Sequence, residues 1–140
     1  MSSQYVPASE ANRTATPSKL RNRALWLLQI LAALFFVAAA ISKFTGAEYN
    51  VMVFEKVGLG QWFRYFTGVL EVTGALLLLR PRSAALGGLL LAVVMVGALF
   101  TDLVILKGNG IPALVALVIT AAIAWLRRPE WMAHRRRPRR

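Results

Sequence analysis

Four charged side chains stand within or beside apolar stretches of the chain, where an ionised group is costly. Glu71 lies in the middle of the apolar run 61–79, and Arg64 lies near the start of that run. Lys43 ends the preceding apolar run, and Asp102 lies near the end of the following one. A charged group at the centre of a membrane-spanning helix costs roughly 2.5–3.5 kcal/mol on insertion scales. Carboxylates and cations retained at such positions can bind a ligand, carry a proton or pair with one another.

Small and polar residues share one face of the helix expected over 61–79. At 3.6 residues per turn this face carries Arg64, Thr67, Gly68, Glu71, Gly74 and Ala75. The next apolar run has a second small-residue face, which allows the close approach of another helix. The residues expected to pack helices together are Gly68, Gly74, Gly87, Gly97 and Thr101.

The composition indicates an integral membrane protein. Of the 140 residues, 57% are hydrophobic, and they come in long blocks rather than in short alternating runs. The chain has no cysteine, which excludes disulfides and zinc–thiolate sites. Its single histidine, His134, lies in a charged tail, so we expect no metal site.

The apolar blocks predict an all-α fold, a transmembrane four-helix bundle. About 20 residues at a rise of 1.5 Å cover a hydrocarbon core of roughly 30 Å. The four expected spans are about 24–44, 62–79, 83–106 and 111–126. Between the first two spans, Val51, Phe54 and Val57 form an apolar face that indicates a short interfacial helix, ended by glycines. Trp62, Phe63 and Tyr65 then form an aromatic anchor at headgroup level.

The first block has an alternative interpretation as a secretory signal peptide. Its basic flank precedes an apolar run, and Ala38, Ala39 and Ala40 resemble a small-residue cleavage site. The apolar run is longer than the roughly 7–15 residues of a signal peptide. A retained span is therefore favoured.

The two ends of the chain are expected to lie in the cytoplasm. Residues 1–23 are polar and lack an apolar period, which predicts a disordered arm, and 129–140 is a basic tail. Most Lys and Arg residues flank one side of the four spans, so the positive-inside rule places both termini in the cytoplasm and the protein in the cell membrane. The net charge of +11 suits anionic lipid headgroups. No folded basic module remains for nucleic acid, and no such partner is expected.

This topology places Lys43, Arg64, Glu71 and Asp102 in the outer half of the bundle as a candidate polar pocket. Two positive and two negative charges would balance, with Lys43 pairing with either Asp102 or Glu71. In the alternative interpretation, Lys43 and Arg64 extend to the outer headgroups and Glu71 remains as one polar contact between helices.

Three other polar residues in the blocks receive no chemical role. Gln29 is expected to bond between helices. Thr101 and Thr120 are expected to bond to carbonyls of their own helices.

Three segments resemble a known family. They read ISKFTG at 41–46, FEKVGLGQWFRYFTGVLEVTGALLLL at 54–79 and VMVGALFTDL at 94–103. Together with the four spans, over about 24–128, the chain resembles the DoxX-like family of small bacterial membrane proteins. The resemblance implies a four-helix membrane bundle and a link to redox chemistry, because named members include a subunit associated with thiosulfate:quinone oxidoreductase and proteins tied to oxidative-stress defence. Where relatives commonly carry Thr-His, this chain has Thr101-Asp102, so histidine-dependent proton or metal chemistry is not expected.

Two hypotheses of function remain open. In the first, the protein is an accessory subunit or ligand-binding component of a membrane redox or oxidative-stress system, with a redox partner or a second copy of itself as its neighbour. In the alternative, it is a quinone-linked or proton-coupled oxidoreductase or a small-solute carrier that uses Glu71. Lys43 and Arg64 would then anchor an anionic or quinone oxygen. No catalytic triad or cofactor-ligand cluster is found, so no catalytic residue is assigned. The cofactor is left unknown, with a quinone as the candidate of the second hypothesis.

Overall fold

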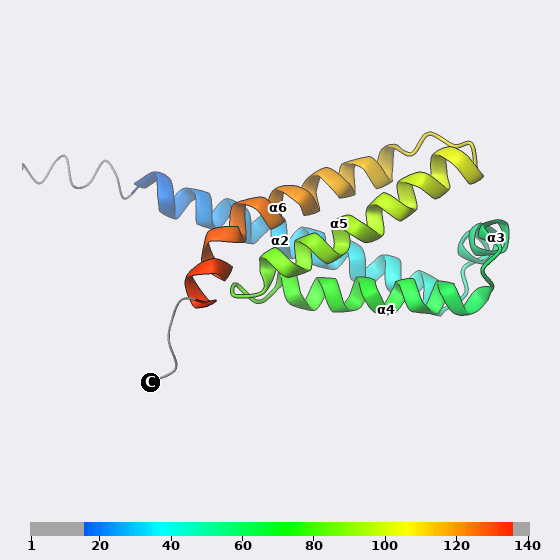
Figure 1. Ribbon diagram of the computed structural model, residues 1–140, viewed down its shortest axis with the longest axis horizontal. Helices are drawn as coiled ribbons and strands as arrows, with labels where there is room; N and C mark the ends of the chain where they lie inside the picture. The colour runs from blue at the N-terminus through cyan, green and yellow to red at the C-terminus, as the bar shows by residue number, and fades with distance from the viewer. Residues whose placement is uncertain (1–15, 136–140) are drawn as a thin grey trace, which may run out of the picture.

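Four long helices, one short helix and one π-helical turn make up the part of the chain that the computed structural model describes, residues 16–135. No strand occurs in this part. The elements are α2 (Thr16–Phe44), α3 (Glu48–Val57), α4 (Gln61–Leu78), α5 (Ala84–Phe100), the π-helix η1 (Thr101–Ile105) and α6 (Ile111–Arg135). The long helices α2, α4, α5 and α6 pack lengthwise, and α3 lies at the end of the assembly opposite the last turns of α6 (Figure 1). The all-α prediction is confirmed.

Three helical segments are long and apolar enough to cross a membrane. They are Lys19–Phe44, Ala84–Ile105 and Ile111–Arg128. Their outward faces carry large apolar side chains, such as Leu34 at 62% exposure and Val93 at 63%, which suit contact with lipid rather than water. The chain is therefore a membrane protein. The helix α4, which carries Arg64 and Glu71, is not among the three.

Two helices extend beyond the limits expected from sequence. The first begins at Thr16, within the segment expected to be disordered, and Pro17 suits a first helical turn because that turn needs no N–H from it. The last continues through Pro129 to Arg135, within the segment expected to be a tail. Its end bends out of line with the rest of α6 (Figure 1), as expected when a proline removes a backbone hydrogen bond. Residues 1–15 and 136–140 of the two expected tails lie outside the described range.

The connection between the first two long helices contains the short helix that the sequence predicts. This helix, α3, ends at Gly58, whose φ of 79° is the left-handed conformation that glycine adopts readily.

The third block differs from its expected form, because the α-helical pattern ends at Phe100 and a π-helical turn follows. The backbone N–H of Leu106 donates to the carbonyl of Thr101 over 2.9 Å, which closes this wider turn.

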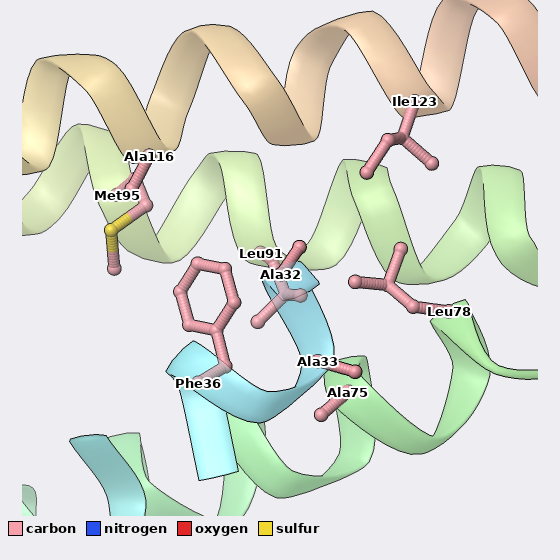
Figure 2. Close-up of a cluster of buried hydrophobic side chains, with 9 residues drawn as sticks. All are labelled: Ala32, Ala33, Phe36, Ala75, Leu78, Leu91, Met95, Ala116 and Ile123. Atoms are coloured by element: carbon pink, nitrogen blue, oxygen red, sulfur yellow. The ribbon is translucent and has the colours of Figure 1, made fainter. Parts of the chain in front are cut away.

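All four long helices contribute to a central apolar core (Figure 2). Its largest buried side chains are Phe36 of α2, Leu78 of α4, Leu91 of α5 and Ile123 of α6. Alanines at the crossings, among them Ala75 with no exposed surface, let these helices approach closely. The core lies between the two ends of the assembly and separates the polar groups found at each end.

Glycines set the closest helix contacts. A Cβ on Gly74 would lie 2.5 Å from Leu91 Cγ, and a Cβ on Gly87 would lie 2.8 Å from the carbonyl oxygen of Gly74. On Gly88 it would lie 2.7 Å from the carbonyl oxygen of Thr120 in α6. By contrast, a Cβ on Gly97 would meet no atom within 4 Å, so this glycine faces outward from the described helices.

We expect Gly88→Ala to destabilise the fold by roughly 1–3 kcal/mol, because the added methyl would strike the backbone of α6. The matched control is Gly97→Ala, which should be neutral or stabilising by up to about 1 kcal/mol, the gain in helix propensity. Thermal unfolding of both variants in detergent measures the difference. Equal melting temperatures for the two would contradict the packing described for α5 and α6.

Candidate functional site

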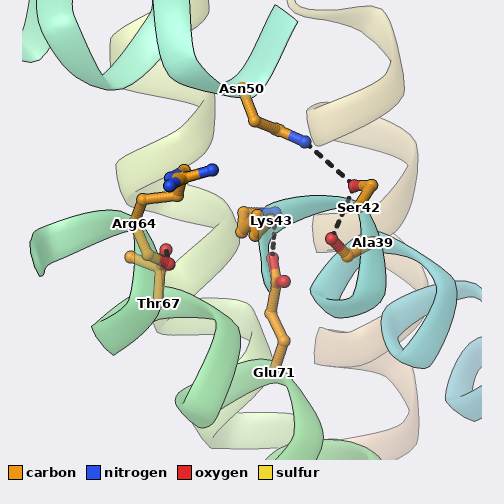
Figure 3. Close-up of polar contacts among 7 residues, drawn as sticks. All are labelled: Ala39, Ser42, Lys43, Asn50, Arg64, Thr67 and Glu71. Carbon is orange, nitrogen blue, oxygen red and sulfur yellow. Dashed lines mark hydrogen bonds and ion pairs between the residues drawn. The ribbon is translucent and has the colours of Figure 1, made fainter. Parts of the chain in front are cut away.

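An ion pair joins α2 to α4 at the α3 end of the assembly. Lys43 Nζ lies 3.0 Å from Glu71 Oε1 and donates a hydrogen bond to it (Figure 3). Glu71 is 2% exposed and the Lys43 side chain 15%. Of the two pairings considered from sequence, Lys43 with Glu71 or with Asp102, the structure shows the first. The buried ion pair satisfies one carboxylate oxygen, and Oε2 of Glu71 has no hydrogen-bond partner in the described chain.

The turn after α2 positions Lys43. Backbone N–H groups of Thr45 and Ala47 donate to the carbonyls of Ile41 and Ser42, and Gly46 takes a left-handed φ of 72°. The Ser42 hydroxyl donates to the carbonyl of Ala39 over 2.7 Å and accepts from Asn50 Nδ2 over 2.9 Å (Figure 3). The last contact ties α3 to the end of α2, above the ion pair.

Arg64 lies two turns along α4 from Glu71, on the same face. Two turns at 1.5 Å per residue place it about 10 Å further along the helix axis. Its side chain is buried, with 5% exposure, so it does not extend to the surface. Its Nη2 donates to the Tyr65 hydroxyl over 3.0 Å, whereas Nε and Nη1 have no hydrogen-bond partner among residues 16–135. A Cβ at Gly46 would lie 3.1 Å from Nη1, which shows that the turn covers the guanidinium closely.

Aromatic side chains flank this arginine. The rings of Phe44 and Tyr65 stack with centroids 6.2 Å apart, and the guanidinium carbon lies 4.7 Å from the Tyr65 ring centroid. Gly68 leaves the room for Phe44, because a Cβ there would lie 3.0 Å from Cζ of that ring. Lysine, arginine and glutamate in their usual ionisation states give the site a formal charge of +1. The arrangement places the buried hydrogen-bond donors of Arg64 next to the aromatic side chains of Phe44 and Tyr65.

Asp102, the fourth member of the expected pocket, lies apart from the ion pair. It belongs to η1 and lines a separate cleft with Tyr49 and Lys56 of α3.

Of the residues expected to pack helices, Gly68, Gly74 and Gly87 face neighbouring elements, while Gly97 does not. Thr101 donates to the carbonyl of Gly97 in its own segment, as predicted.

A second buried polar cluster lies at the opposite end of the assembly. Arg127 is 2% exposed; its Nε donates to Gln29 Oε1 over 2.7 Å and its Nη1 to Asn22 Oδ1 over 3.0 Å. Gln29 also donates to the backbone carbonyl of Leu78, so it links α2 to α4 and α6. This confirms the interhelical role predicted for Gln29. The prediction that Thr120 bonds to its own helix is also confirmed.

The burial of Arg127 was not anticipated. The sequence places it at the exit of the last block, where arginine normally reaches the headgroups. A buried glutamine in a membrane helix needs hydrogen-bond partners, however. Gln29 was therefore the signal that a polar residue from the end of another helix lies beside it.

We expect Lys43→Met to destabilise the protein by about 3–5 kcal/mol, because it leaves the carboxylate of Glu71 buried without its cation. The double variant Lys43→Met/Glu71→Met should regain most of that stability, since an apolar pair replaces the buried ions. Lys56→Met, at an exposed lysine of α3, is the control and should change little. Detergent-solubilised thermal unfolding measures all three. If Lys43→Met melts like the control, the ion pair does not join α2 to α4.

Known proteins match this chain over most of the described helices. The DoxX-like family matches residues 27–126. A curated protein named "Putative oxidoreductase CatD", from Bacillus subtilis (strain 168), is 28% identical over 75 residues. That alignment covers 54% of this chain and 56% of the relative, so the chain spans about half the length of the relative that it matches. No solved structure matches.

Proposed function

Since the chain belongs to the DoxX-like family, we propose that it is a ligand-binding component of a membrane redox system. The proposed site comprises Lys43, Arg64 and Glu71, between α2 and α4. The redox setting is supported by the name of the Bacillus relative, which describes an oxidoreductase. The residues of the site themselves support binding rather than a particular reaction.

The observation that carries this proposal is the state of Arg64. A guanidinium that is 5% exposed and has two nitrogens without hydrogen-bond partners in the described chain is unusual, because unsatisfied buried donors cost roughly 1–3 kcal/mol each or more when charged. A ligand oxygen that accepts from these nitrogens would remove that cost. The formal charge of +1 favours an anionic or strongly polar oxygen.

A quinone fits the residues present. Arg64 supplies donors for a ring oxygen, Lys43 adds the N–H groups that it does not donate to Glu71, and Phe44 and Tyr65 supply aromatic surface for the ring. The large apolar surface of the helices suits an isoprenoid tail in the bilayer. Such a cofactor, when bound, supplies two-electron redox chemistry. The protein residues would bind and orient its head.

The site requires a specific topology in the bilayer. We infer that α4 crosses the membrane as a fourth span, so that α2, α4, α5 and α6 form a transmembrane four-helix bundle and α3 lies at the interface. The lengthwise contacts of α4 with α2 and α5 support this inference, as does the partnering of Glu71 within the assembly. The distribution of Lys and Arg supports a cytoplasmic position for both termini, and a position of the site towards the outer face of the cell membrane.

The content of the site supports an accessory role. It offers cations, one carboxylate and aromatic rings, which suit binding rather than a particular reaction. We therefore propose that electrons pass to or from a separate membrane redox partner. A second copy of the chain is the alternative neighbour.

A second candidate function rests on Glu71 itself. Its Oε2 is buried and has no hydrogen-bond partner in the part described, so it is placed to accept a proton. In this version Glu71 exchanges a proton during quinone-linked redox chemistry or small-solute transport. The positive charge of Lys43 favours the ionised form of the Glu71 carboxylate between proton transfers. The two candidates differ in whether neutralising Glu71 leaves ligand binding intact.

We expect the purified full-length protein in lipid nanodiscs to bind decylubiquinone, and Arg64→Gln to weaken binding by roughly tenfold or more. The reason is that a hydrogen bond to a charged donor contributes about 1.5–3 kcal/mol, and each 1.4 kcal/mol is a factor of ten. The control is Arg82→Gln, at an exposed arginine in the turn after α4, which should bind as the unaltered protein does. Isothermal titration measures affinity, and native mass spectrometry of the same samples reports the number of bound quinones and any partner.

Equal affinity of Arg64→Gln and Arg82→Gln would contradict the proposed site. Glu71→Gln separates the two candidates. If it binds decylubiquinone but no longer takes up a proton when the quinone is reduced, the proton-coupled function is favoured; if binding itself falls, Glu71 serves to hold Lys43 for the ligand.

A further inference from the structure

A cleft lined by polar and apolar residues lies at the same end of the molecule, on the face of α3 that points away from the ion pair. It has a volume of about 260 Å³ and lies between α3 and the segment that joins η1 to α6. Its lining includes Tyr49, Met52 and Lys56 of α3, and Asp102, Asn109 and Pro112 opposite. The α3 residues follow one another at helical spacing, so one face of this helix meets the cleft. The opposite face carries Asn50 and Phe54, which contact α2 and α4 side chains.

Two opposite charges line this cleft without pairing. No ion pair joins Lys56 to Asp102, although both border the same cavity, and within the described range neither side chain has a hydrogen-bond partner. Their charged atoms are therefore separated by more than the 4.0 Å of a direct ion pair. A molecule that carries both an ammonium and an anionic group can lie between them and satisfy both. The Tyr49 hydroxyl and the Asn109 amide offer further hydrogen bonds.

The backbone holds Asp102 at this position by unusual means. It lies in the π-helical turn η1, a conformation found frequently at functional sites. Its carbonyl oxygen accepts from the N–H of Gly108 over 2.7 Å, which folds the following turn back against η1. In that turn Lys107 has a φ of 53°, which is uncommon for a residue with a Cβ. Such conformations persist where surrounding contacts require them.

We propose that this cleft binds a small zwitterion, with its ammonium at Asp102 and its anionic group at Lys56. The volume lies below the roughly 300–1,000 Å³ of pockets for drug-sized ligands, so it suits a group of headgroup size. Apolar side chains of the cleft, Met52 and Pro112, border the polar pair. This inference rests on neither the quinone nor the ion pair of Lys43.

Two sources can supply this chemistry. One is the phosphoethanolamine headgroup of a phospholipid, because the cleft lies at an end of the membrane-crossing segments, where headgroups gather. The other is a free amino acid or phosphoethanolamine in solution. Both carry an ammonium that can donate hydrogen bonds to a carboxylate, whereas the trimethylammonium of phosphatidylcholine cannot.

The test is native mass spectrometry of the full-length protein equilibrated with equal amounts of phosphatidylethanolamine and phosphatidylcholine of matched chains. We expect preferential retention of phosphatidylethanolamine, and Asp102→Asn should reduce that preference by roughly tenfold, because it removes the charge that accepts from the ammonium. Lys56→Gln, at an exposed site that should not disturb folding, should weaken retention as well. Glu55→Gln, beside Lys56 but outside the cleft lining, is the matched control and should retain the preference.

Competition with free ligands distinguishes the sources. If phosphoethanolamine or alanine in solution displaces the lipid, or binds in its absence with the same dependence on Asp102, the cleft takes free zwitterions; if only the lipid binds, it is a headgroup site. The proposal is overturned if the unaltered protein prefers neither lipid and binds neither free zwitterion. It is also overturned if Asp102→Asn and Lys56→Gln behave as Glu55→Gln does.

Discussion

The ion pair between Lys43 and Glu71 is the constraint on which the α3 end of this protein depends. A carboxylate with 2% exposure cannot remain ionised in an apolar assembly unless a cation reaches it, and Lys43 is the cation that does so. Lys43 lies in the last turn of α2, so the pair ties the end of this helix to α4. The left-handed turn at Gly46 then follows immediately and closes over Arg64. The ion pair, the turn at Gly46 and the second cation, Arg64, therefore lie together at this end of the protein.

The protein has polar clusters at both ends of its long helices and an apolar core between them. At one end lie the Lys43–Glu71 ion pair and Arg64, whose Nε and Nη1 have no hydrogen-bond partner in the described part of the chain. At the other end Gln29 and Arg127 link three helices through hydrogen bonds. Buried polar networks of this kind help to specify how helices assemble in a medium where apolar contact alone does not distinguish one helix face from another. Phe36, Leu78, Leu91 and Ile123 fill the space between the two clusters.

Much of this arrangement could be predicted from the residues. The apolar blocks gave the long helices, Gly58 marked the end of the short one, and the cost of a buried carboxylate indicated that Glu71 needed Lys43 or another cation. Local signals could not show that Arg127 turns inward, because arginine after an apolar block normally reaches headgroups. Nor could local signals show that Asp102 lies apart from Glu71 in the folded protein. That separation depends on the π-helical turn and on the position of α3, both of which arise from tertiary contacts. The start of α2 at Thr16 was missed because the polar composition of this segment outweighed its helix-starting Pro17.

The most direct test is whether α4, with its arginine and glutamate, crosses the bilayer. The chain has no cysteine, so single cysteines can be placed at the exposed residues that flank this helix, Leu59→Cys before it and Arg82→Cys after it. We expect a membrane-impermeant maleimide to label position 59 in intact cells and position 82 only after the membrane is permeabilised. Labelling of both positions from the same side would show that α4 does not cross, and would contradict a membrane-embedded site built on Lys43 and Glu71.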